Sequence, residues 1–113
     1  MMDPLERLLD YREKLLAAGI RGVIDGRDVN PPAVLVRPPT IHYRFGRGAH
    51  ACDWEARLYL PDSGTEQALK AALPLIDQVQ TALQGAVVDA TPADFQLADG
   101  GTAPGYILTW STH

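Results

Sequence analysis

The sequence predicts an α+β domain, in which one mostly antiparallel β-sheet packs against two helices in the order α-β-β-β-β-α-β-β. Two amphipathic segments have helical spacing, and several short apolar runs alternate with period two between Gly, Pro and Asp turns. The chain has 113 residues, 46% of them hydrophobic and 21% charged, which is typical of one globular unit. We therefore expect residues 1–113 to form a single domain.

The first predicted element is a helix over residues 3–18. Asp3 is a suitable N-cap, Pro4 fits the first helical position, and Gly19 is suited to a left-handed C-terminal cap. Glu6 completes a capping-box spacing with Asp3. The predicted buried face consists of leucines at helical spacing, namely Leu5, Leu8, Leu9, Leu15 and Leu16.

Four strands are expected next, over residues 20–24, 33–36, 41–45 and 54–60, separated by Asp-Gly, Pro-Pro and Gly-rich turns. In the third, Ile41, Tyr43 and Phe45 share one face, and in the fourth Trp54 to Leu60 alternate in the same way. The third and fourth strands are predicted to form a long antiparallel hairpin.

A second helix is predicted over residues 65–83, with a kink or two abutting pieces at Pro74, because proline removes one backbone hydrogen bond. Short strands follow around residues 95–97 and 106–110, joined by a turn at Gly100-Gly101. Two helices cover only one face of such a sheet. Partial exposure of the other face, which would include Tyr59 and Ile107, favours assembly with another subunit.

Composition argues against several classes of protein. No run approaches the roughly 20 apolar residues of a membrane-spanning helix, and the start lacks the pattern of a signal peptide, so we expect a protein of a reducing cytoplasm without membrane contact. The net charge is −4, with +1 over residues 1–57 and −5 over residues 58–113, which does not favour nucleic-acid binding. No nucleotide-binding or common hydrolase motif occurs, so we expect neither an enzyme nor a cofactor.

Cys52 is the only cysteine, and His50 and Asp53 lie close to it in the chain. A thiol-dependent enzyme using Cys52 and His50 is therefore an alternative hypothesis, although a buried small residue is the simpler interpretation. A metal site formed by His42 with these three residues lacks the paired ligand spacing of structural zinc.

Residues 37–50 contain three arginines and two histidines but no acid, whereas the C-terminal half is acidic. Arginine is suited to contacts with carboxylates across an interface, so head-to-tail association of identical subunits would bring opposite charges together. The residues predicted to contact another subunit or a partner are Arg37, His42, Arg44, Arg47, Arg57 and Tyr59. A merely solvated hairpin is the alternative.

The order of these features resembles the small tail terminator proteins of long-tailed, siphovirus-type bacteriophages, particularly those that infect actinobacteria. The resemblance spans almost the whole chain. It lies in a leading helix that ends Ala-Ala-Gly-Ile, Asn-Pro-Pro-Ala-Val-Leu-Val at 30–36, Pro-Pro-Thr-Ile at 38–41, a strand that starts at Trp54, Asp-Ser-Gly-Thr at 62–65, an alanine- and leucine-rich helix, and Pro-Gly-Tyr-Ile-Leu-Thr-Trp at 104–110.

The resemblance implies a structural virion protein that assembles in the host cytoplasm into a ring, commonly a hexamer, at the head-proximal end of the tail tube. The ring stops tube polymerisation and offers a surface to head completion proteins. Its partners would be itself, the tail tube protein and a head completion or connector protein, with DNA passing through the lumen without specific binding. Asp89, Asp94 and Asp99 are candidates for the lumen wall. Two competing hypotheses are a different head-tail connector, such as a neck protein, and a nucleic-acid binding module.

Overall fold

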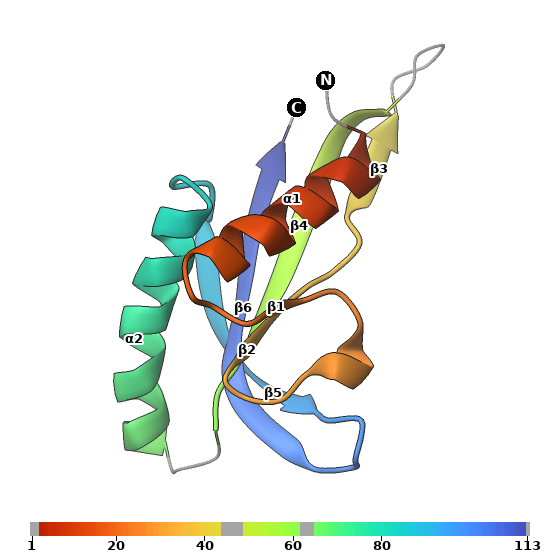
Figure 1. The fold of residues 1–113 in the computed structure, drawn as a ribbon. Helices are drawn as coiled ribbons and strands as arrows, with labels where there is room; N and C mark the ends of the chain where they lie inside the picture. The colour runs from red at the N-terminus through yellow and green to blue at the C-terminus, as the bar shows by residue number, and fades with distance from the viewer. Residues whose placement is uncertain (1–2, 44–48, 62–64, 113) are drawn as a thin grey trace.

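The computed structural model describes residues 3–43, 49–61 and 65–112. Along these ranges the elements are α1 (Pro4–Ala17), β1 (Gly22–Val23), η1 (Gly26–Asp28, a 3-10 turn), β2 (Ala33–Val36), β3 (Thr40–Tyr43), β4 (Ala49–Tyr59), α2 (Thr65–Ala82), β5 (Asp89–Gln96) and β6 (Thr102–Thr112) (Figure 1). The predicted α+β class and element order are confirmed.

The strands form one sheet in the order β1-β2-β4-β6-β5, and β3 pairs with β4. Because β4 is 11 residues long, β2 pairs with its second half and β3 with its first half, both antiparallel. The short pairing of β1 with β2 is parallel. Antiparallel β6 and β5 complete the other side of the sheet. The predicted hairpin of the third and fourth strands is thus present as β3–β4.

Both ends of α1 have the predicted local signals. The backbone N–H of Glu6 donates to Asp3 Oδ1 at 2.8 Å, and Gly19 adopts a φ of +80°. The N–H of Ile20 donates to the carbonyl of Leu15 at 2.9 Å, which is the six-to-one bond of a Schellman motif. The helix boundaries therefore follow from local chemistry.

The predicted buried face of α1 is only partly right. Leu8, Tyr11 and Leu15 are buried, whereas three of the predicted leucines are exposed, Leu5 at 63%, Leu9 at 37% and Leu16 at 48%. The helix has two apolar stripes about 100° apart at 3.6 residues per turn. The sheet buries the stripe that contains Tyr11.

Tyr11 sits in an aromatic cluster that holds α1 on the sheet. Its ring meets Trp54 edge-on at a centroid distance of 5.0 Å and Trp110 edge-on at 5.3 Å. Trp110 Nε1–H donates to the Tyr11 hydroxyl at 3.2 Å, and Trp54 Nε1–H donates to Thr112 Oγ1 at 3.0 Å. The cluster therefore buries large apolar rings while both indole N–H groups keep a partner.

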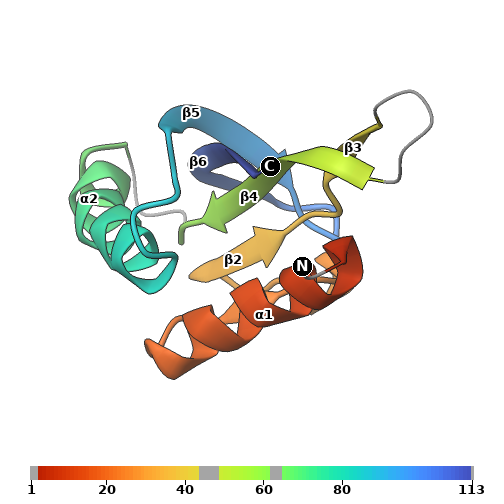
Figure 2. The ribbon, with the colours of Figure 1, turned by 90° about the horizontal axis from the view of Figure 1, so that it is seen from above.

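α2 runs as one helix through Pro74, rather than as two pieces. Its buried face contains small residues, Ala68, Ala72 and Val79, and Leu83 is buried directly after the helix ends. Gln80 fixes the segment after the helix, because its side chain donates to the Val87 carbonyl and accepts from the Val87 N–H, both at 2.9 Å. Both helices pack on the same face of the sheet, as Figure 2 shows from above.

The later strands are longer than predicted, and one facing prediction is wrong. The sequence suggested strands of three and five residues where β5 and β6 have 8 and 11. The register shifts between His42 and Tyr43, and Tyr43 is 67% exposed instead of sharing the inward face of Ile41. Phe45 lies outside the described residues. The irregularity in register ends the regular alternation of side-chain directions, which the sequence pattern predicted to continue along this strand.

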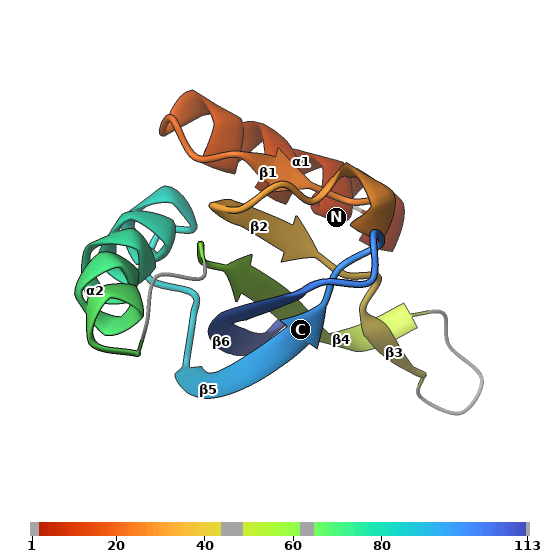
Figure 3. The ribbon, with the colours of Figure 1, turned by 90° about the horizontal axis from the view of Figure 1, so that it is seen from below.

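The face of the sheet opposite the helices has a small core of its own. Leu35, Tyr59, Phe95 and Ala103 are buried there, and Val23, Val29 and Leu97 pack against them. The β1–β2 connection and the tip of the β5–β6 hairpin supply this cover at one end of the face (Figure 3). Over the described ranges, no helix is long and apolar enough to cross a membrane.

Candidate interaction surface

The alternating side chains of β4 build a row of charged groups on the helix-free face. Cys52, Trp54, Ala56 and Leu58 are buried in the helix-side core. The residues between them therefore point the other way, and Asp53, Glu55, Arg57 and Tyr59 follow one another along the strand. The predicted facing of β4 is confirmed.

Asp53 lies at the polar end of the row and links three strands. It accepts a hydrogen bond from Ser111 Oγ of β6 at 2.7 Å, and its other oxygen lies 2.6 Å from His42 Nε2 of β3. The side chains of His42 and Asp53 are 53% and 56% exposed. The carboxylate lies between the hydroxyl and the imidazole, whereas in a Ser-His-Asp triad the imidazole lies between the other two. The arrangement is thus a polar cluster and lacks the order of a nucleophile and its base.

Glu55 occupies the middle of the row and joins two arginines. Its Oε2 lies 3.0 Å from Arg57 Nε on the same strand and 3.6 Å from Arg37 Nη1, just beyond β2. The guanidinium of Arg57 also lies 5.5 Å from the centre of the Phe95 ring, within the range of a cation–π contact. These side chains are 31% to 45% exposed, so each ion pair contributes only about 0 to 1 kcal/mol to stability. These charged side chains can therefore exchange ion-pair partners at a small cost in free energy.

Four of the six predicted interface residues belong to this face, Arg37, His42, Arg57 and Tyr59. Arg44 and Arg47 lie outside the described residues. Tyr59 is only 4% exposed and its ring packs 4.7 Å from that of Phe95, so its side chain has almost no surface to offer a partner. The expectation of an exposed Tyr59 is corrected, because the chain's own turns and hairpin cover that end of the face.

Three residues of this face were not predicted as interface residues, namely Asp53 and Glu55 of the row and Ser111 of β6. The predicted alternation over residues 54–60 already assigned Glu55 to this face, whereas Asp53 lies just before that predicted strand and within the longer β4 of the structure. Ser111 pairs with Asp53 across β4 and β6, which are 58 residues apart in the chain at this point. A single sequence carries no local signal for that register.

Cys52 does not share a site with the polar residues next to it in the chain. It is 8% exposed and belongs to the helix-side core, while Asp53 points to the opposite face. The side chain of His50 lies outside what the structure describes. Among the described residues, no group of three or more His, Cys, Asp or Glu is placed to hold a metal ion.

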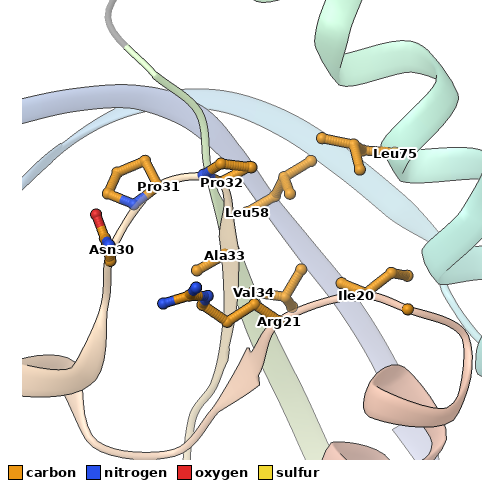
Figure 4. Close-up of a pocket in the computed structure, with 10 residues that line it drawn as sticks. Ile20, Arg21, Asn30, Pro31, Pro32, Ala33, Val34, Leu58 and Leu75 are labelled. Carbon is orange, nitrogen blue, oxygen red and sulfur yellow. The ribbon is translucent and has the colours of Figure 1, made fainter.

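A small pocket lies between the end of α1, the start of β2 and α2, with a volume of about 270 Å³ (Figure 4). The Asn30-Pro31-Pro32 run forms one side, with a cis bond between the two prolines, and Leu58 and Leu75 form the apolar floor and wall. This volume is below the range of about 300 to 1,000 Å³ that is typical of ligand pockets.

The turn before η1 contains a carboxyl group whose pKa is clearly shifted. Arg27 lowers the pKa of Asp25 from 3.8 to about 2, first through side-chain hydrogen bonds and then through its backbone N–H. The Arg27 Nη2 to Asp25 Oδ2 distance is 2.7 Å. This pair shapes the turn that covers the small second core.

A comparison with models of known protein families found none that matches the chain, and no curated protein matches it.

Proposed function

We propose that this protein is a structural phage tail protein of the tail terminator type, which acts by self-assembly and docking. In this role it forms a ring, commonly a hexamer in such proteins, at the head-proximal end of the tail tube. The ring ends tube polymerisation and offers a docking surface to a head completion or connector protein. Such a protein works in the virion and assembles in the host cytoplasm.

The observation that carries the proposal is the unequal cover of the two faces of the sheet. Both helices pack on one face, and the other presents Asp53, Glu55 and Arg57 in a half-exposed row. Half-exposed charges of both signs are typical of the polar parts of protein interfaces. Arginine is one of the residue types enriched at positions that dominate binding energy, and the Phe95 ring beneath Arg57 holds its guanidinium in place on this face.

A ring requires two different patches on each subunit, because every copy contacts one neighbour with each. The charge of the chain is divided in a way that suits this. Residues 37–57 contain four arginines and two acids, whereas residues 71–113 contain four aspartates and no Lys or Arg.

Electron microscopy and multi-angle light scattering of the purified protein, alone and with tail tubes, test the proposal. We expect rings of uniform diameter and tubes that stop growing once capped. Reversing charge on the helix-free face by Arg37→Glu with Arg57→Glu should weaken assembly or capping, while Arg21→Glu, an exposed arginine outside this face, serves as the control. Monomers without affinity for tubes would refute the function. Binding to the portal complex in place of the tube would favour a neck protein.

A further inference from the structure

The sequence contains two Asp-Gly dipeptides, Asp25-Gly26 and Asp99-Gly100. An Asp followed by Gly is prone to backbone isomerisation, because glycine has no side chain to hinder the attack of its backbone nitrogen on the carboxyl carbon of the Asp. One dipeptide begins the η1 turn, and the other lies at the tip of the β5–β6 hairpin (Figure 1). Both glycines are exposed, and a Cβ atom added to either would meet no atom within 4 Å. The two sites differ in how the carboxyl group is held.

The reaction begins when the glycine nitrogen attacks the carboxyl carbon of the preceding Asp. The new C–N bond closes a five-membered succinimide, and the hydroxyl of the carboxyl group leaves with the amide proton as one molecule of water. Water then adds back at one of the two imide carbonyls. Opening of the original peptide bond gives isoaspartate, whose chain runs through the side-chain carbonyl, and opening of the new bond restores Asp. The reacting form is the protonated carboxyl, because a carboxylate has no adequate leaving group.

The contacts of Asp25 oppose this reaction. Arg27 Nε lies 3.2 Å from each carboxylate oxygen, Arg27 Nη2 lies 2.7 Å from Oδ2, and the Arg27 backbone N–H donates to Oδ1 at 3.0 Å. These bonds lower the pKa of Asp25 from 3.8 to about 2, first through the Arg27 side chain. Each unit of pKa changes the protonated fraction at neutral pH tenfold, so this fraction is about 60-fold smaller than for a carboxyl of ordinary pKa.

Asp99 is held much less firmly. Over the part of the chain that the structure describes, it has no ion pair, and its one hydrogen bond is accepted by Oδ1 from the Gly101 N–H at 2.8 Å. This bond folds the carboxyl group back against the backbone that follows, on the side of the reacting glycine. Gly100 has a φ of +90° in this turn. The geometry therefore brings carboxyl and backbone together without a cation that keeps the carboxylate ionised.

One contact at the hairpin tip acts in the opposite direction. The Gly100 N–H donates to the Leu97 carbonyl at 3.0 Å, and this bond must open before the nitrogen can attack. The net loss of one hydrogen bond at an exposed tip slows the reaction by about 2- to 10-fold. This factor is smaller than the effect of Arg27 on Asp25. Asp99 is therefore the more reactive of the two sites in the folded chain.

We propose that Asp99 is the site at which the native protein is modified by isoaspartate formation, whereas Asp25 is spared. The product has one additional backbone carbon at the tip of the hairpin. Leu97 donates its N–H across this tip to the Gly101 carbonyl at 2.7 Å, and its side chain packs against the small core that contains Tyr59 and Phe95. We expect the modification to loosen this part of the cover of the helix-free face. The inference does not depend on the proposed ring.

The test follows both sites during incubation of the full chain at neutral pH, with electron-transfer fragmentation in a mass spectrometer to distinguish isoaspartate from Asp in proteolytic peptides. The chain unfolded in urea is the reference, because both Asp-Gly sites should then react at similar rates. In the native chain we expect Asp99 to stay within about 10-fold of its rate in urea and Asp25 to fall by about 60-fold, so that Asp99 converts at least about 6-fold faster.

Two variants test the assigned cause. Arg27→Ala should raise the native rate at Asp25 toward its rate in urea and leave Asp99 unchanged, while Arg21→Ala, at an exposed arginine outside the turn, should change neither rate. A native chain in which Asp25 converts as fast as Asp99 would overturn the proposal. Absence of conversion at Asp99, over a time in which the unfolded chain reacts at both sites, would also overturn it. An unchanged rate at Asp25 in Arg27→Ala would overturn the assigned selectivity.

Discussion

Replacing Tyr11 by Phe removes one hydroxyl from the aromatic cluster and little else. Trp110 is 3% exposed, and its Nε1–H donates to that hydroxyl at 3.2 Å. The substitution leaves a buried donor without its partner, which costs about 1 to 3 kcal/mol. Tyr11→Ala also removes the ring and both edge-on contacts, and a large-to-small change of an aromatic core residue costs about 3 to 5 kcal/mol.

Urea unfolding followed by tryptophan fluorescence measures these losses, at one protein concentration for all variants so that assembly contributes equally. With a slope of about 2 kcal/mol per molar urea, the loss of about 1 to 3 kcal/mol in Tyr11→Phe should lower the midpoint by about 0.5 to 1.5 M. Leu16→Ala is the matched control on the same helix, because Leu16 is 48% exposed, and its effect should stay within about 0.5 kcal/mol. If Tyr11→Ala costs no more than Leu16→Ala, α1 is not anchored through Tyr11 and the assigned face of the helix is wrong.

Three further predictions concern separate parts of the chain. Arg27→Ala should return the pKa of Asp25 from about 2 toward 3.8, as measured by NMR titration of the carboxyl carbon, and an unchanged pKa would contradict the assigned cause. In the wild type, the stabilisation from this pair is complete above pH 3.8 and is lost as the pH falls through 2, because the carboxylate is then protonated. Gly105→Ala should destabilise the protein by more than about 3 kcal/mol or prevent folding, because the new methyl group would overlap the carbonyl of Leu58 in the neighbouring strand; a urea midpoint near that of wild type would show that the β4–β6 pairing is looser than described. Cys52 should react with a thiol reagent far more slowly in the native chain than in denaturant, because it is 8% exposed, and equal rates would place the thiol at the surface.

The sequence allowed the helix ends to be predicted because their signals are local. Asp3, Pro4 and Gly19 act within one helical turn of the boundaries they define, and the structure has the predicted N-terminal bond and positive φ there. The length of β5 and β6 was underestimated because Pro92 and Gly105 interrupt the expected strand pattern. Pro92 fits within a strand because its nitrogen points away from the neighbouring strand β6. Gly105 fits because a side chain at that position would overlap the backbone of the neighbouring strand β4. Both conditions depend on the tertiary structure.

For the candidate surface, the alternation along β4 predicted which residues share the helix-free face, since successive side chains of a strand point to opposite sides. The same reasoning could not show that Tyr59 is covered. The covering residues, Val29 and Leu97, come from connections distant in the chain, whose path is set by long-range packing.

By itself, the sequence determined the element order, the helix caps and the two faces of β4, because each depends on residues within a few positions of one another. Only the tertiary structure decided which apolar stripe of α1 is buried and which strands are neighbours in the sheet. It also decided that Ser111 donates a hydrogen bond to Asp53 and that Arg57 lies over the Phe95 ring. Those outcomes depend on contacts between residues tens of positions apart. The free energy of such contacts depends on how whole surfaces fit together, and no short stretch of sequence encodes that fit.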